Sequence, residues 1–214
     1  MAEAAQTRPR KERKQNAERR RRQLLDAARA SILKHGLAKT TLATVSDAAG
    51  LSQGVAVFYF RSKAGLLTET LRDLYQGYHD HWTAALAAAG DDPADQLRAL
   101  LRADFDEEAC GVEVLPLWFA FWGELHFQST YDAVAEDFDN RRRQVIEDIC
   151  RRLLPDAPEG EGERVAEWLD TLSDGYWQRL HLAPASFDRD AAYRTALDWA
   201  ERVMSGVAGQ PLRG

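Results

Sequence analysis

The sequence predicts an all-α fold of about nine helices, with a small three-helix head followed by a larger helical body. Three observations support this prediction. Apolar residues recur at spacings of three and four along most of the chain, and glycine and proline separate these stretches. No stretch alternates apolar and polar residues in the way a strand does. A chain of 214 residues is long enough for two hydrophobic cores.

Charge is divided unevenly along the chain. The formal net charge is −6, but residues 1–63 contain 14 Lys and Arg against 5 Asp and Glu. This gives a balance of +9 for residues 1–63 and leaves −15 for residues 64–214. A basic head on an acidic body favours the binding of a polyanion through the head alone, because the body repels phosphate.

The chain begins with a basic segment, residues 1–17, that contains almost no large apolar residues. Such a segment cannot form a core, so we expect it to be a disordered arm. From Glu18 the apolar residues return at helical spacing, and Gly36 favours the end of this first helix. We therefore expect three regions: the arm 1–17, the head 18–62 and the body 63–207.

Two short helices on either side of a glycine turn complete the predicted head. Thr40 or Thr41 is expected to cap the first of them, and Gly50 favours its end because glycine tolerates a left-handed turn. Ser52 is expected to cap the other helix, which ends near Tyr59.

Six further helices are expected in the body. The first spans about 39 Å at 1.5 Å per residue, which is long enough to join head and body. Asp92-Pro93 favours the start of the second helix, and Gly111 favours its end. The expected ranges are 63–88, 93–109, 114–126, 130–154, 163–182 and 189–205.

The two short head helices have the pattern of a helix-turn-helix. The major groove of DNA admits one α-helix, whose amino-terminal residues contact base edges. Ser52, Gln53, Gly54 and Val55 are small enough to approach bases from the start of the third helix. The Gln53 amide is suited to paired hydrogen bonds with adenine, and Val55 or Val57 to contact with a thymine methyl group.

The head resembles the tetracycline-repressor-like transcriptional regulators over residues 18–68. The matching residues are Thr41-Leu42-x-x-Val45-x-x-Ala48-x-Gly50-Leu51-Ser52-x-Gly54 and Phe58-Tyr59-Phe60-x-Ser62-Lys63-x-x-Leu66-Leu67. The resemblance implies a double-stranded DNA operator as partner, with the start of the third helix facing bases and the positions of Thr41, Tyr59 and Lys63 lying against phosphates. The expected DNA-binding residues are Thr41, Thr44, Ser52, Gln53, Gly54, Val55, Val57, Phe58, Tyr59 and Lys63.

Several of these head residues also fit a purely structural role. Tyr59 and Lys63 are compatible with ordinary surface positions. The place of Lys63 in the first turn of a long helix favours a phosphate, because free N–H groups and the helix dipole act there together. The basic run from Arg19 to Arg22 provides either non-specific attraction to DNA or a solvated start of the first helix.

The body helices carry many aromatic residues. Trp118, Phe121 and Trp122 share one helix face by their spacing, as do Asp174 and Trp177 on another helix. Aromatic rings beside a carboxylate suit a quaternary ammonium ligand, because ring faces are negative and such a cation cannot donate a hydrogen bond. The expected ligand-binding residues are Tyr78, Trp82, Phe105, Trp118, Phe121, Trp122, Asp174 and Trp177. The alternative is that each of these aromatic residues is part of the core.

Parts of the body resemble the choline-responsive repressors of glycine-betaine synthesis genes. The residues concerned are Phe105-Asp106-Glu107, Trp118-x-Ala120-Phe121-Trp122 and Asp174-Gly175-x-Trp177-x-Arg179. The resemblance implies choline or a related quaternary ammonium as a small-molecule effector, whose binding releases the DNA. Candidate carboxylates are Asp104, Asp106, Glu107 and Asp174.

The last two helices carry apolar stripes. These stripes either pack onto the body or, as the family resemblance implies, pair with their copies in a homodimer. Two recognition helices about 34–36 Å apart would then fit successive major grooves of a pseudo-palindrome. The expected dimer-interface residues are Val165, Trp168, Leu169, Leu172, Tyr193, Leu197, Ala200 and Met204.

Other functional classes receive little support from the sequence. It contains neither a His-Glu-x-x-His motif nor a glycine-rich loop ending in Lys-Ser/Thr, so we do not expect an enzyme. The two cysteines lack the spacing of a zinc site, and His79 and His81 lie two apart and so point to different helix faces, which suggests no metal or cofactor. No apolar stretch reaches the roughly 20 residues that span a bilayer, so we expect a cytoplasmic protein that does not bind membranes. Two alternatives remain: a repressor that responds to a different cationic or amphipathic ligand, as multidrug-efflux repressors do, and a constitutive DNA-binding module.

Overall fold

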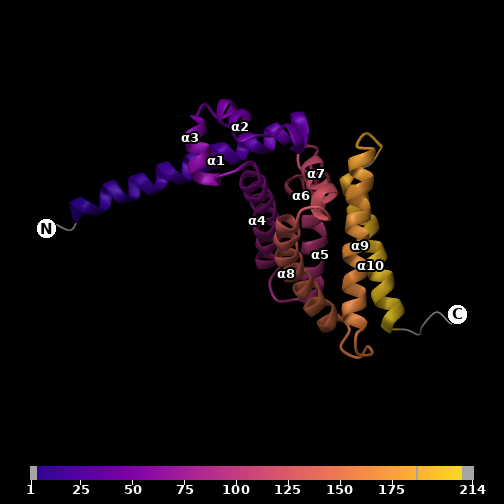
Figure 1. Ribbon diagram of the computed structural model, residues 1–214. Helices are drawn as coiled ribbons and strands as arrows, with labels where there is room; N and C mark the ends of the chain where they lie inside the picture. Colours follow the sequence, from indigo (N-terminus) through magenta and orange to yellow (C-terminus); the bar gives the residue numbers. More distant parts are fainter. Residues whose placement is uncertain (1–3, 187, 209–214) are drawn as a thin grey trace. The chain divides into compact units, whose positions relative to one another are not determined.

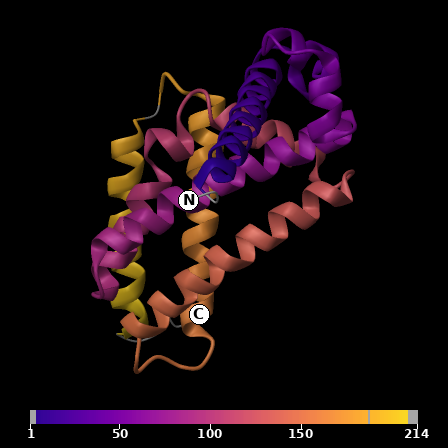
Figure 2. The same cartoon turned by 90° about the vertical axis from the view of Figure 1, so that its left-hand side faces the viewer.

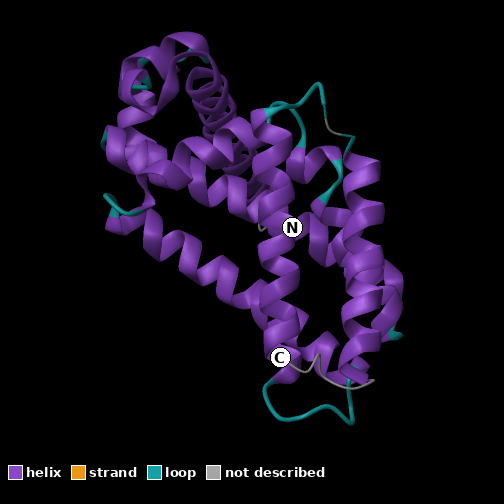
Figure 3. Cartoon of the chain, turned by 90° about the vertical axis from the view of Figure 1, so that its right-hand side faces the viewer, coloured by secondary structure: helices purple, strands orange, loops and turns teal. Residues whose placement is uncertain are grey.

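The computed structural model describes residues 4–186 and 188–208, with side chains for residues 11–186 and 188–206. All regular elements in these ranges are helices (Figures 1 and 3), which confirms the predicted all-α class. In chain order they are α1 Ala4–Lys39, α2 Leu42–Ala48, α3 Gln53–Phe60, α4 Lys63–Ala89, α5 Pro93–Asp104, α6 Glu107–Cys110, α7 Leu115–Leu125, α8 Ser129–Leu153, α9 Glu161–Leu182 and α10 Arg189–Ala208.

The first helix begins earlier than the sequence predicts. Residues 4–17, expected as a disordered arm, belong to α1, whereas residues 1–3 of that arm lie outside the described residues. The expectation relied on the lack of apolar residues. Ala, Glu, Lys, Arg and Gln dominate the segment, however, and these residues favour a helix without a core. The predicted stop at Gly36 is confirmed, because its φ of 77° and ψ of 169° interrupt α1.

Within the described residues there is one helix more than the sequence predicts, because the expected helix 93–109 is divided. α5 ends at Asp104, and α6 begins at Glu107. Asp106 occupies the N-cap position of α6 with extended backbone angles, φ −74° and ψ 160°. Aspartate favours helix caps over helix interiors because its side chain competes for backbone hydrogen bonds.

The chain divides into two compact units. Unit 1 comprises residues 1–73 and 120–131, and unit 2 comprises residues 74–119 and 132–214. The boundaries fall within α4, α7 and α8. Unit 1 therefore contains more than the expected head, since it includes the start of α4 and the end of α7.

Unit 1 has a small core shared by α1 to α4. Leu24 and Leu25 of α1, Val45 of α2 and Ala56 and Phe60 of α3 are buried together. α2 begins with the predicted cap, in which Thr41 and Thr44 exchange hydrogen bonds between side chain and backbone. Gly50 ends the turn after α2 with a φ of 64°, as expected. This core fixes α3 against α1 and α2.

The junction between α3 and α4 requires a glycine. A Cβ atom on Gly65 would lie 2.2 Å from the backbone oxygen of Phe60. The Gly65 amide donates a 3.0 Å hydrogen bond to Ser62 Oγ, which satisfies one free N–H group at the start of α4. Gly65 thus allows the end of α3 to lie directly against the first turn of α4.

Unit 2 contains a second core. α9 and α10 pack side by side (Figures 1 and 2), and they bury Val165, Leu169 and Ala200 in one cluster with α4, α5 and α8. Cys110 and Cys150 are also buried in unit 2, and burial raises the pKa of both thiols to about 12. No helix in the described part of the chain is both long and apolar enough to cross a lipid bilayer.

Candidate functional site

The first turn of α3 presents polar and small residues to solvent. Ser52, Gln53 and Gly54 are exposed, and the Ser52 hydroxyl makes no cap hydrogen bond. Further along α3, Val57 is 43% and Phe58 77% exposed. These residues are accessible, as groove contacts require. Val55 is less accessible, because it is half-buried and packs against the core of unit 1. The assignment of these residues to DNA stays a prediction.

The sequence around this turn also matches a pattern known from hydrolases. Gly50-Leu51-Ser52-Gln53-Gly54 has the form Gly-x-Ser-x-Gly. In α/β-hydrolases that pattern places a nucleophilic serine on a sharp turn from a strand to a helix. Here Ser52 lies between two helices, so the structural context of a nucleophile elbow is not present at this position.

Tyr59 and Lys63 direct their polar groups at the backbone of α1. The Tyr59 hydroxyl donates a 3.0 Å hydrogen bond to the carbonyl oxygen of Ala17, and Lys63 Nζ donates one of 2.5 Å to that of Ala38. The phenol oxygen can still accept a hydrogen bond, and the ammonium group keeps two further protons. Both residues therefore have a structural role here, which the sequence did not show.

The basic run of α1 is partly used within unit 1. Arg21 pairs with Glu69 at 2.5 Å, and Arg22 and Arg29 pair with Asp73 at 2.6 and 2.7 Å. These pairs connect α1 to the first half of α4, on side chains that are partly exposed. Two members of the predicted non-specific DNA contact, Arg21 and Arg22, thus hold unit 1 together.

In unit 2, four aromatic rings from α4, α7 and α9 form one cluster, which we call the ring cluster. Its members are Tyr75, Tyr78, Trp118 and Trp177. The ring centroid of Trp118 lies 4.7 Å from that of Tyr75 and 6.0 Å from those of Tyr78 and Trp177. Tyr78 and Trp177 lie 5.4 Å apart, with an interplanar angle of 67°. The sequence predicted three of these residues and missed Tyr75.

A buried ion pair lies beside the ring cluster. Asp104, at the end of α5, is fully buried, and both its oxygens accept from Arg142 Nη2 at 2.8 and 2.9 Å. The carboxylate also accepts from the Tyr78 hydroxyl at 2.6 Å and from Ser173 Oγ at 2.9 Å. Trp177 Nε1 donates to the backbone oxygen of Asp104 at 2.7 Å. The ion pair thus fixes two rings of the cluster.

Acidic groups outnumber basic ones around Arg142. Its guanidinium lies 5.7 Å from the centre of the Tyr78 ring and also pairs with Asp170. Burial raises the pKa of Asp174 to about 7, and repulsion from Asp170 and Asp104 adds to the rise. Burial and Asp170 likewise raise the pKa of Asp139 to about 6. Both aspartate residues are exposed to solvent.

The remaining predicted ligand residues lie elsewhere. Trp82 belongs to the hydrophobic core of unit 2 and stacks edge-on against His79, and Phe105 is buried against Tyr176. Phe121 and Trp122 belong to unit 1, where Phe121 is buried against Tyr131. The structure therefore brings Tyr78, Trp118, Trp177 and Asp174 into one neighbourhood and assigns Trp82 and Phe105 to the core.

Arg142 is the functional candidate that sequence reasoning missed. It lies four positions after Phe138 and four before Ile146, both buried residues on the apolar face of α8. An arginine at such a position needs a buried partner, because an unpaired buried charge is costly. That spacing could have identified the pair with Asp104, which was already a candidate carboxylate.

The exposed face of α9 and α10 carries an apolar groove of about 670 Å³. Trp168, Leu172, Tyr176 and Trp199 are among the residues that line it, and Trp168 is 40% exposed. Of the expected dimer residues, Trp168 and Leu172 line the groove. Val165, Leu169 and Ala200 are at most 2% exposed inside unit 2, so they cannot contact a partner and are core residues. Tyr193, Leu197 and Met204 are half-buried against the same core.

These features define a helix-turn-helix regulator with a separate helical body. Two family profiles match the chain: bacterial regulatory proteins of the tetR family over residues 24–70, and the C-terminal domain of BetI-type transcriptional repressors over residues 93–205. The HTH-type transcriptional regulator BetI of Paraburkholderia xenovorans (strain LB400) is 35% identical over 186 residues, which cover 87% of this chain and 94% of the relative. The chain therefore belongs to the tetR family and is a transcriptional repressor of the TetR/BetI type.

Two solved structures share the fold. A protein of Pseudomonas aeruginosa PAO1, assigned as a transcriptional regulator, aligns with a TM-score of 0.81 at 23% identity and covers 88% of this chain and 92% of its own. A protein of Saccharomonospora viridis with the same assignment, solved in complex with choline, aligns with a TM-score of 0.74 at 20% identity. That alignment covers 85% of this chain and 95% of the other.

Proposed function

We propose that the protein is an effector-controlled repressor that binds a pseudo-palindromic operator as a homodimer and releases it when choline or a related quaternary ammonium binds. Genes for betaine synthesis are the expected targets. The observation that carries this proposal is the ring cluster in unit 2 with its surplus of carboxylates. The BetI relatives and the choline complex of a structural neighbour support it.

The chemistry of the ring cluster suits a permanent cation. Asp104, Asp139, Asp170 and Asp174 lie around Arg142, and Arg143 is also near Asp139, so the ionised carboxylates outnumber the arginines. A quaternary ammonium cannot donate hydrogen bonds, and it is stabilised by ring faces and by nearby carboxylates. We propose that Tyr75, Tyr78, Trp118 and Trp177 contact the cation and that Asp174 supplies a negative charge nearby.

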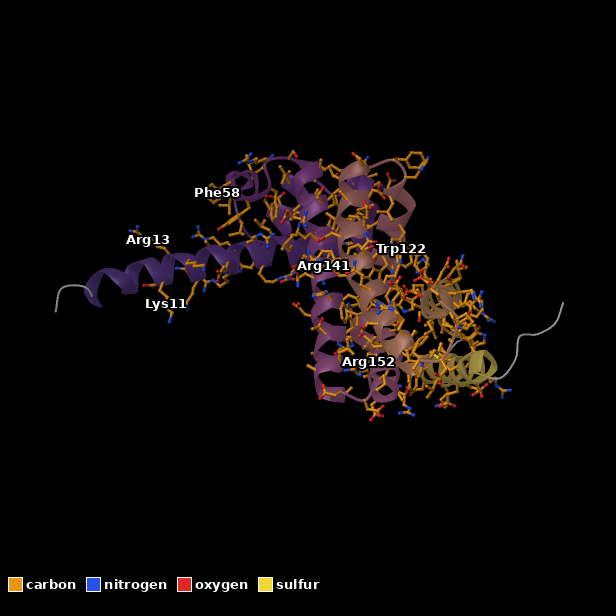
Figure 4. All side chains as sticks on the ribbon, turned by 90° about the horizontal axis from the view of Figure 1, so that it is seen from below. Lys11, Arg13, Phe58, Trp122, Arg141 and Arg152 are labelled. Atoms are coloured by element: carbon orange, nitrogen blue, oxygen red, sulfur yellow. The ribbon has the colours of Figure 1, made fainter. Side chains whose placement is uncertain are left out.

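Phe121 and Trp122 remain proposed effector residues in unit 1. They lie three and four positions after Trp118 on α7, and Trp122 is half-buried. Figure 4 labels Trp122 on α7. Their contribution is tested by substitution, Trp122→Ala, with the effector response as the readout.

The DNA contacts that we propose follow the exposed surface of unit 1. Ser52, Gln53, Gly54, Val57 and Phe58 would face bases, with Val55 beside them. The polar groups of Thr41, Thr44, Tyr59 and Lys63 would lie against phosphates. Phosphate contacts set the position of a protein on DNA, whereas contacts to base edges give specificity.

The proposed dimer uses the outer face of α9 and α10. The groove lined by Trp168, Leu172, Tyr176 and Trp199 is an exposed apolar surface, and such surfaces mark interfaces. A two-fold dimer presents two recognition helices, as a pseudo-palindromic operator requires.

Calorimetry on the full chain tests the effector. Choline, betaine aldehyde and tetraphenylphosphonium are titrated separately, with sodium chloride as the ionic control. We expect saturable heat with choline, and a variant with Trp177→Phe and Asp174→Asn should lose most of it. Binding of tetraphenylphosphonium alone would instead support the alternative of a regulator for other cationic or amphipathic ligands. No heat with any of the three would contradict the proposed effector class.

A further inference from the structure

α1 is longer at its start than the helix-turn-helix requires. The tetR-family profile begins at residue 24, but α1 begins at Ala4. In Figure 1 this first part of α1, drawn in indigo, projects past α2 and α3 of the same unit. From residue 11 to residue 23 it carries seven Lys and Arg against two Glu. We call residues 4–23 the α1 extension.

The α1 extension is fixed against the recognition helix. The only side chain of α3 known to hydrogen-bond with it within the described residues is Tyr59, whose hydroxyl donates to Ala17 at 3.0 Å. Three basic residues lie three or four positions from Ala17 along α1, namely Arg13, Lys14 and Arg20. They therefore share the side of α1 that faces α3. In the view of Figure 4, Arg13 points to the side of α1 on which Phe58 lies, and Lys11 points to the opposite side.

These three basic side chains are available for a partner. All three are exposed, and no ion pair engages Arg13 or Arg20 in the part of the chain that the structure describes. Lys14 makes only a 3.8 Å pair with Glu18, and both side chains are more than 60% exposed. Such exposed ion pairs contribute little to stability, so a phosphate can readily replace Glu18 as the partner of Lys14. Arg21 and Arg22 differ from them because they are held by Glu69 and Asp73.

The dimensions of DNA identify the partner. The major groove is about 12 Å wide, so a helix lying in it has phosphates about 6 Å away on either side. Along α1, four residues advance about 6 Å, and the thirteen residues from Ala17 back to Ala4 advance about 20 Å. A basic helix that leaves a groove-bound α3 at Ala17 is therefore long enough to reach the flanking sugar–phosphate strand.

We propose that the α1 extension is a second DNA-contacting element, in which Arg13, Lys14 and Arg20 bind phosphates that flank the sequence read by α3. This inference rests on the proposed binding of DNA by unit 1. The contacts add affinity without sequence preference, because every base step presents the same phosphates.

The test compares two variants of the full chain that lose the same charge. The first carries R13A, K14A and R20A. The control carries R98A, R141A and R143A on α5 and α8, where Arg98 and Arg141 form exposed ion pairs within their own helices and Arg141 also lies over the Phe138 ring. Fluorescence anisotropy measures binding to a 30-base-pair duplex of mixed sequence between 50 and 200 mM salt. Circular dichroism and thermal unfolding confirm that both variants are folded.

We expect the plot of log affinity against log salt concentration to become shallower by about 0.9 for each lost phosphate contact in the first variant. At 100 mM salt its affinity should fall at least tenfold relative to the control, and R13K/R20K should retain the slope of the unmodified chain. Equal slopes for the first variant and the control would overturn the inference while leaving DNA binding intact. An unmodified chain that binds no duplex would overturn the proposed function as well.

Discussion

Arg142 shows how one charged residue can organise its surroundings. Its guanidinium holds Asp104, and Asp104 in turn accepts hydrogen bonds from Tyr78 and Ser173. Burial raises the pKa of Tyr78 further, so its phenol remains protonated and continues to donate. A buried ion pair of this kind contributes more to specific geometry than to net stability. Removal of one partner, however, leaves the other charge buried without a counterion.

Substitution of Arg142 by methionine should therefore strongly destabilise the fold. We expect R142M to lower the free energy of unfolding by about 3–5 kcal/mol, because the Asp104 carboxylate loses its counterion. Urea unfolding measures this loss. R143M, at the exposed neighbouring position, should stay within about 0.5 kcal/mol of the unmodified chain. If D104N added to R142M restores none of the stability, the electrostatic explanation is wrong.

Gln53 and Lys63 should differ in what they contribute to DNA binding. Gln53→Ala should reduce the preference for operator over random duplex by about 1–3 kcal/mol, whereas Lys63→Ala should weaken binding to both duplexes. Binding competition between the two duplexes measures the difference. Because Lys63 also bonds the Ala38 carbonyl, thermal unfolding of Lys63→Ala must be measured alongside. Identical effects of the two substitutions on both duplexes would refute these roles.

Among the helices, the start of α4 is the most sensitive to added volume. Gly65→Ala would place a Cβ atom 2.2 Å from the Phe60 backbone oxygen, so α3 must move away from α4. We expect a loss of at least about 2 kcal/mol in stability and a clear loss of DNA affinity, since α3 is displaced. Thermal unfolding and anisotropy measure the two effects.

Gly77 provides the matched control in the same helix. Nothing lies within 4 Å of a Cβ atom built there, so Gly77→Ala should stabilise α4 by up to about 1 kcal/mol. If both substitutions have the same effect, close approach at Gly65 is not the cause.

Local sequence rules predicted the helices where a particular residue settles the boundary. Thr41, Gly50 and Asp92 act as expected, because capping and left-handed turns depend only on neighbouring backbone. The start of α1 was missed because helix propensity was weighed less than the absence of apolar residues. The break at Phe105 was missed because the ion pair of Asp104 involves α8 and α9, which lie far away in the sequence.

The candidate site was predicted less completely than the fold. Helical spacing identified Trp118 and Trp177, but aromatic residues at core positions have the same spacing, so spacing alone could not separate a ligand site from the core at Trp82 and Phe105. Likewise, the stripes of α9 and α10 did not show which side faces solvent. A helix in a two-layer arrangement carries apolar residues on two faces, and only packing shows that Val165 and Leu169 point inward while Trp168 points outward.

For the molecule as a whole, Asp174 should make the effector response dependent on pH. Its pKa of about 7 means that the carboxyl group is mostly neutral at pH 6 and mostly ionised at pH 8. Choline carries a fixed charge, so its affinity should rise with pH over this range, by at most about tenfold. Calorimetry at three pH values measures the change in affinity. In D174N the rise should be smaller than in the unmodified chain, and what remains belongs to Asp139, whose pKa is about 6. An undiminished rise in D174N would assign the effect to another group.

The Asp174 carboxyl group should affect stability in the opposite direction: stability should fall as pH rises, whereas choline affinity should increase. Because the folded-state pKa is above the unfolded value of about 4, the folded chain binds more protons between pH 4 and 7, and this contribution to stability falls as pH rises through that window. D174N should therefore raise Tm at pH 8 but not at pH 4. Solvent screens part of the repulsion, so the gain should not exceed about 1 kcal/mol, or about 2–4 °C.

Assembly should depend on the groove of α9 and α10. Trp168→Glu places a charge in this apolar surface, so we expect the proposed dimer to dissociate and operator affinity to fall more than tenfold. Sedimentation velocity measures the oligomeric state. Val112→Glu, at a position that is 72% exposed and outside the groove, should remain dimeric. A dimer that persists in Trp168→Glu would show that the interface lies elsewhere.

The two buried cysteines have a practical consequence. With pKa values of about 12, Cys110 and Cys150 are ionised in only about one molecule in 10⁵ at pH 7, and the thiolate is the form that reacts with maleimides. A cysteine introduced at Arg13 would therefore react alone, without removal of the native thiols. A dye attached there would report directly, by quenching or energy transfer, how near the start of α1 comes to a labelled duplex.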